Sequence, residues 1–80
     1  MKQKRIDEAI AKYTAVFEQY PEDIRADNAL FELAEVYENI LNDESKAMEL
    51  YEKIFIDYSG STLAVEARKN FRRLRGDVVQ

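Results

Sequence analysis

The chain has 80 residues, a net charge of −4 and 46% hydrophobic residues, which fits one small globular domain and excludes a disordered tail. No apolar run approaches the roughly 20 residues that cross a bilayer, so no transmembrane segment is expected. Cysteine and histidine are absent, which excludes disulfides, thiolate zinc sites and nucleophile pairs built on Cys or His.

The first half of the chain predicts two helices. Apolar residues three and four apart indicate a helix over about residues 6–20. Pro21 ends it, because proline disfavours helix at the residue before it and lacks an N–H group. A second helix is predicted over residues 24–41, with Asp23 as a candidate cap and a stripe rich in alanine that lets a neighbouring helix approach closely.

The second half predicts two more helices. A turn over residues 42–45 offers capping side chains before a helix over 44–58. Gly60 fits a left-handed position after that helix, and Ser61 fits the N-cap of a last helix over 62–75.

Together these elements predict an all-α fold of four antiparallel helices, stacked in chain order as a single domain over residues 1–76. Gly76 stops the last helix, and residues 77–80 are expected to form a frayed tail. The first ten residues have a basic flank but no apolar signal core, so no targeting segment is expected and the compartment is left open.

The chain repeats itself with a period of 38 residues, and the matches fall on the predicted inward stripes while the solvent-side positions differ. A repeated packing unit has this property, because the contact surface is the shared constraint. The identical pairs are Ala9 and Ala47, Tyr13 and Tyr51, Phe17 and Phe55, Tyr20 and Tyr58, Ala26 and Ala64, and Ala29 and Ala67.

The stretch LFELAEVY…KAMELYEKIFIDYS resembles a tetratricopeptide repeat. The positions that carry the resemblance are Leu30, Leu33, Ala34 and Tyr37 on the first helix of the pair, and Ala47 and Tyr51 on the second. Ser59 stands where the family usually has proline, and the period is longer than the usual ~34 residues, as in a long-helix variant. Ala9, Tyr13 and Pro21 repeat the second-helix pattern, so the order is second-type helix, full repeat, first-type helix.

The resemblance implies a short α-solenoid with a right-handed superhelix, whose ligands lie in a groove lined by the first-type helices. Bacterial envelope proteins of the outer-membrane assembly and cell-division coordinator types contain such repeats, so a cytoplasmic or periplasmic place follows if the parent protein is one of these. The ending AR-x-x-F-R-x-LRG looks like the last helix of an array. The alternative is an unrelated four-helix stack with alanine-lined contacts.

The groove that the resemblance implies would have two walls. One wall is acidic and carries an aromatic residue, and the other wall is basic. Such a surface suits an extended peptide held by hydrogen bonds and charge pairs. Solvated helix faces are the alternative, and Phe31 is either an exposed anchor or packs at the edge between the second and fourth helices. The candidate residues are Asn28, Phe31, Glu32, Glu35 and Asn39 on one wall, and Lys69, Asn70 and Arg73 on the other.

A candidate basic patch of Arg68, Arg72 and Arg75 lies on one flank of the last helix. Shifted by 38 residues, these positions correspond to apolar positions of the second helix, so the arginines indicate a polar cap where no further helix follows. Binding of anionic peptide, lipid or nucleic acid is the alternative. Nucleic acid is not expected, because residues 18–52 hold eleven acids against two bases, a net −9 that repels a polyanion.

The sequence therefore predicts a protein–protein interaction module with no catalytic chemistry, no metal and no cofactor. Its partner is a protein or peptide whose identity the residues do not specify. The alternative is a structural C-terminal cap of a larger array without its own ligand. The first helix has no first-type partner before it, so the chain is expected to be a fragment of a longer array or a weak homodimer through that helix.

Overall fold

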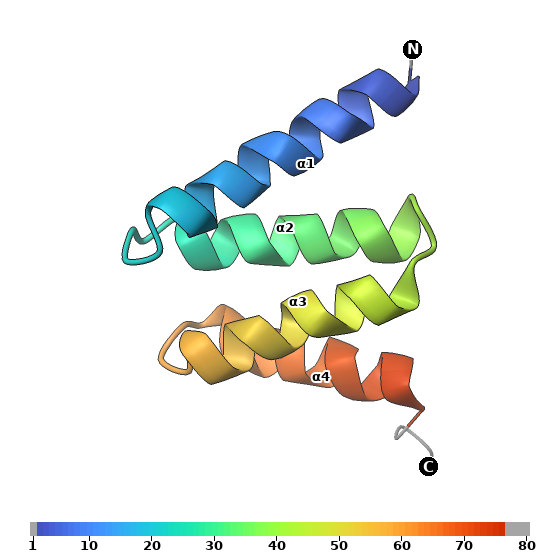
Figure 1. Ribbon diagram of the computed structural model, residues 1–80. Coiled ribbons are helices and arrows are strands. Elements are labelled where there is room, and N and C mark those ends of the chain that lie inside the picture. The colour runs from blue at the N-terminus through green and yellow to red at the C-terminus, as the bar shows by residue number, and fades with distance from the viewer. Residues whose placement is uncertain (1, 77–80) are drawn as a thin grey trace.

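The computed structural model describes residues 2–76, with side chains from residue 4 onward. It contains four helices, α1 Lys2–Gln19, α2 Ala26–Asn39, α3 Glu44–Asp57 and α4 Leu63–Arg75. Each helix packs against the next one in the chain, and α2 also touches α4 (Figure 1). The predicted all-α fold of four helices packed in sequence is confirmed. The predicted tail over 77–80 lies outside the described residues.

The core lies between α2 and α3, with two alanines added by α4. Ala26, Ala34, Ala47 and Ala67 are completely buried, and their small side chains let the helix backbones approach closely. Among the described residues, α1 contributes half-buried side chains only, since it has a single neighbouring helix. The other buried residues are Ala29, Leu30, Leu33, Leu50, Tyr51, Ile54 and Ala64.

The α2 helix is shorter at both ends than the sequence predicts. It begins at Ala26, because the Asp23 carboxylate accepts a hydrogen bond from the Arg25 N–H at 2.8 Å and closes a turn in place of a helix cap. Ile24 is consequently 89% exposed in that turn. At the other end the helix stops before Ile40, and Asn42 takes a left-handed φ of 55°.

A polar side chain caps α3, whereas α4 begins after a turn: its N-cap residue is Thr62 and not the predicted Ser61, and Thr62 makes no side-chain cap bond. Asp43 accepts a hydrogen bond from the Lys46 N–H at 3.1 Å, which satisfies one of the free donors at the start of α3. Ser61 Oγ accepts from the Leu63 N–H at 3.0 Å at the start of α4. The left-handed position predicted for Gly60 is wrong, because among the described glycines the positive φ belongs to Gly76, at 93°.

Tyr20 departs from its predicted inward place. It lies just beyond the end of α1, before Pro21, and is 60% exposed. Its repeat partner Tyr58 is half-buried and donates a hydrogen bond to the Pro21 carbonyl at 2.7 Å. This bond ties the turn between α1 and α2 to the turn between α3 and α4, which lie on the same side of the stack (Figure 1).

Candidate functional site

The candidate groove residues lie on the sides of α2 and α4 that the core leaves open. Asn28, Glu32, Glu35 and Asn39 are exposed and follow one another at three or four residues, so they share one face of α2. On α4, Lys69 and Arg73 are exposed and Asn70 is half-buried. We refer to these seven residues together with Phe31 as the α2–α4 face.

The strongest link between the two walls is Glu38, a residue that the sequence reasoning missed. Its carboxylate forms an ion pair with Arg73 at 2.7 Å and accepts a hydrogen bond from the Tyr51 hydroxyl at 2.9 Å. The side chain of Glu38 is 12% exposed. Arg73 also donates to the Asn70 side-chain oxygen at 3.4 Å. One carboxylate therefore joins α2, α3 and α4.

The sequence holds one signal for Glu38. It follows the buried Ala34 by four residues, so it lies at the edge of the buried stripe of α2 and not on the solvent face. Its partner could not be identified in this way, because α2 and α4 are not neighbours in the chain.

Phe31 packs onto the chain's own core and is not an exposed anchor. It is half-buried, and its ring meets the ring of Tyr51 edge to face with centroids 5.5 Å apart. The contact is with α3, whereas the sequence placed the alternative contact at the edge between α2 and α4. Burial, followed by the hydrogen bond to Glu38, raises the pKa of Tyr51 above its usual value.

The acidic part of the α2–α4 face borders α1. Tyr13 of α1 donates a hydrogen bond to Glu32 at 2.6 Å, which raises the pKa of the Tyr13 hydroxyl. A hollow of about 420 Å³ between α1 and α2 is lined by Tyr13, Glu32, Glu35 and Asn39, among others. The structure thus brings Glu32, Glu35 and Asn39 together at this hollow, while Arg73 turns to Glu38.

Glu35 is an acid with no cation paired to it among the described side chains. Its carboxylate forms no hydrogen bond or ion pair with residues 4–76. Partial burial, and then the nearby carboxylates of Glu32 and Glu38, raise the pKa of Glu35 above its usual value. The folded chain therefore holds the Glu35 proton more tightly than an ordinary glutamate does, and a positive charge placed next to the carboxylate would be stabilised.

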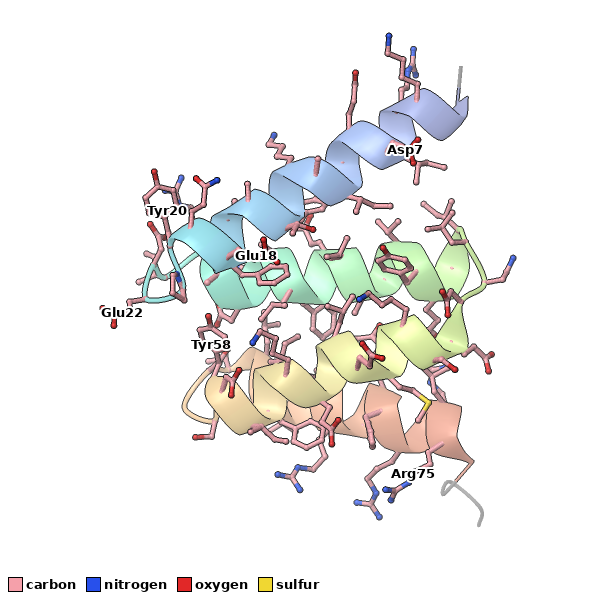
Figure 2. All side chains as sticks on the ribbon, viewed as in Figure 1. Asp7, Glu18, Tyr20, Glu22, Tyr58 and Arg75 are labelled. Atoms are coloured by element: carbon pink, nitrogen blue, oxygen red, sulfur yellow. The ribbon has the colours of Figure 1, made fainter. Side chains whose placement is uncertain are left out.

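Two of the three arginines of the candidate basic patch, Arg68 and Arg75, lie over aromatic rings at the end of the stack. The Arg68 guanidinium lies 4.7 Å from the centre of the Phe55 ring, and that of Arg75 lies 5.1 Å from the centre of the Phe71 ring. The two rings meet edge to face, with centroids 5.4 Å apart. Figure 2 shows Arg75 at the α4 end, on the opposite side of the stack from α1.

Two further kinds of site are not found in the described part of the chain. No group of three or more acidic, His or Cys side chains within residues 2–76 is placed to hold a metal ion. No helix over the same residues is long and apolar enough to cross a membrane.

Helices that pack in chain order, with an internal period and alanine-lined contacts, define an α-helical repeat stack. The family model of the tetratricopeptide repeat matches residues 28–61, which include most of α2 and all of α3. This helix pair is therefore a tetratricopeptide repeat, as its resemblance indicated, and such repeats are in general non-catalytic modules that bind other proteins. Comparisons with curated proteins and with solved structures found no match to the chain.

Proposed function

We propose that the chain is a non-enzymatic interaction module whose α2–α4 face binds an extended segment of a partner protein. The observation that carries this proposal is Glu35, an exposed carboxylate whose neighbours are two further carboxylates, while Arg73 of the basic wall is paired with Glu38. A lysine or arginine of the partner would supply the missing charge.

The rest of the face offers groups that suit a peptide backbone. Asn28 and Asn39 flank Glu35 on the same exposed side of α2, and each side-chain amide can both donate and accept hydrogen bonds. Lys69 on α4 is exposed and offers a cation for an acidic side chain or a carboxylate. A segment that carries a basic residue at Glu35 and an acidic residue toward α4 therefore fits both walls.

The non-catalytic part of the proposal rests on how the reactive side chains are engaged. The hydroxyls of Tyr13, Tyr51 and Tyr58 each donate to an acceptor of the chain itself, and Glu38 is neutralised by Arg73. These contacts hold helices and turns together, which is a structural role.

A second candidate function is the cap of a larger helical array. The stacking of Arg68 on Phe55 and of Arg75 on Phe71 favours it, because long arginine side chains cover apolar rings while their charges stay in water. Both functions can belong to one chain, since they use different residues.

The proposal is tested with short fluorescein-labelled peptides in matched pairs that differ by Lys or Glu at one central position. Binding is followed by fluorescence anisotropy with the wild type, Glu35→Lys and the control Glu52→Lys, which reverses an exposed acid of α3. We expect Glu35→Lys to weaken the Lys peptide about tenfold, equivalent to about 1.4 kcal/mol, and Glu52→Lys to leave it within about twofold. Equal weakening by both variants would reduce the effect to net charge and contradict the proposal.

A further inference from the structure

We propose that the outer flank of α4 is a docking site for an acidic amphipathic helix of a partner protein. We call this flank the arginine face and define it by Arg68, Phe71, Arg72 and Arg75. It lies at the end of the stack, apart from the α2–α4 face, and it does not depend on the function proposed there.

The internal repeat identifies this flank as a helix-binding surface. On α2, the flank that packs on α3 carries the buried residues Leu30, Leu33 and Ala34 and the half-buried Tyr37. A shift of 38 residues converts these four positions into Arg68, Phe71, Arg72 and Arg75 of α4. The surface that receives a helix on α2 is thus repeated on α4, where no further helix of the described chain covers it.

The arginine face is arranged to receive carboxylates. Arg68, Arg72 and Arg75 follow one another at four and three residues, which places them in one ridge along the helix. The rings of Phe55 and Phe71 support the guanidinium groups of Arg68 and Arg75, and this stacking reduces the side-chain freedom that would be lost on binding. A stacked guanidinium can still offer its N–H edge to a carboxylate.

Charge decides which kind of helix fits. The α4 helix holds five cations and one acid, and Arg73 is the cation paired on the other side, with Glu38. An apolar helix would bury the guanidinium groups of Arg68 and Arg72 without supplying carboxylates for them, which is costly. An acidic helix instead supplies a carboxylate for each of these two arginines.

A second copy of the chain is a poor occupant. The helix that would continue the stack is α1, because it carries the second-type pattern. The α1 position equivalent to the buried Leu50 of α3 is Lys12, an exposed cation. Continuing the stack would bring Lys12 toward the arginines, so like charges oppose head-to-tail assembly. Charge therefore favours a helix of another protein over a second copy of this chain.

The contact of α3 on α2 specifies what the partner helix must carry. In that contact α3 supplies Ala47, Leu50 and Ile54, which are three or four residues apart and buried. The partner needs the same spacing with glutamates or aspartates opposite the arginines. Small apolar side chains between them would cover the half-buried ring of Phe71.

The test uses a designed helical peptide with a ridge of glutamates four and three residues apart, flanked by alanine and leucine. Its control is an isomer of equal composition whose glutamates are spread around the helix. Binding is measured by fluorescence anisotropy, and the contact is located by chemical-shift changes of the ¹⁵N-labelled protein. The variant Arg68→Glu/Arg72→Glu is compared with Lys4→Glu/Arg5→Glu, which changes the net charge equally at exposed positions of α1.

We expect the ridge peptide to bind with shifts along the outer flank of α4, and the isomer to bind about tenfold more weakly, or about 1.4 kcal/mol. The Arg68/Arg72 variant should lose binding, while the Lys4/Arg5 variant and Glu35→Lys should keep it. Equal binding of the isomer, or an equal loss in the Lys4/Arg5 variant, would overturn the proposal. So would absence of peptide binding, including the case where phosphatidylserine vesicles or a single-stranded oligonucleotide bind at the arginines instead.

Discussion

Removal of the Tyr51 hydroxyl tests the link that Glu38 makes between three helices. In Tyr51→Phe the Glu38 carboxylate keeps Arg73 but loses its second partner, at a position where its side chain is 12% exposed. A hydrogen bond to a charged group contributes about 1.5–3 kcal/mol. Because Arg73 is half exposed, a water molecule beside it can replace the lost hydroxyl as a partner of Glu38. We therefore expect the free energy of unfolding to fall by an amount at the lower end of that range, about 1.5 kcal/mol.

The assay is urea unfolding followed by far-UV circular dichroism, with thermal unfolding beside it. For a domain of this size the expected loss lowers Tm by about 6–12 °C. The internal repeat supplies the control, because Tyr13 occupies the equivalent position in α1. Its hydroxyl donates to the exposed Glu32, so Tyr13→Phe should cost only about 0.5 kcal/mol, as water replaces the lost bond.

The same hydroxyl makes stability depend on alkaline pH. The pKa of Tyr51 is raised in the folded protein, so the folded state holds this proton more tightly than the unfolded chain does. The resulting stability is complete below the unfolded pKa of about 10 and is lost as the pH rises above it. Tyr51→Phe should reduce this alkaline slope. Equal free energies of unfolding for Tyr51→Phe and Tyr13→Phe, with an unchanged slope, would refute the role given to Glu38.

Three further substitutions probe the other surfaces. Glu35→Gln should leave the free energy of unfolding at pH 7 unchanged or raise it by up to about 0.5 kcal/mol. The reason is that the raised pKa of Glu35 means that its ionisation disfavours folding. A clear loss of stability in urea unfolding would show that Glu35 is paired. Arg72→Leu/Arg75→Leu should promote self-association in sedimentation velocity, and unchanged sedimentation would remove the interpretation as a cap. Ser61→Ala removes both the acceptor of the Leu63 N–H and the hydrogen bond that Ser61 donates to the Asp27 carboxylate of α2. It should cost about 1.5 kcal/mol or more in urea unfolding, whereas the exposed neighbour Ser59→Ala should cost almost nothing.

The architecture could be predicted because its contacts are local and repeated. Alanines and aromatics at fixed spacing specify which side of each helix faces the next one. The helix ends were harder to predict, because an apolar residue fits the helical spacing whether or not the backbone at that residue is helical. Ile24 and Ile40 extend the stripe of α2, yet Ile24 lies in a turn and Ile40 follows the last helical residue.

The candidate site could be predicted in part. Exposure of Asn28, Glu32 and Glu35 follows from helical spacing alone. The ion pair of Glu38 with Arg73 does not, because it requires the separation and relative rotation of two helices that are not neighbours in the chain. The edge-to-face contact of Phe31 was missed for a different reason, because a residue off the buried stripe of α2 can still reach a ring of the neighbouring helix α3.

The central claim is that the α2–α4 face binds an extended segment of a partner protein. The most direct measurement is a backbone-amide NMR titration with pools of short acidic and basic peptides, and with a single-stranded oligonucleotide as a separate ligand. We predict shifts confined to the neighbourhood of Phe31, Glu35, Asn39, Lys69 and Asn70 with peptides that contain a basic residue. Absence of shifts with every peptide pool, or shifts with the oligonucleotide alone, would contradict the claim.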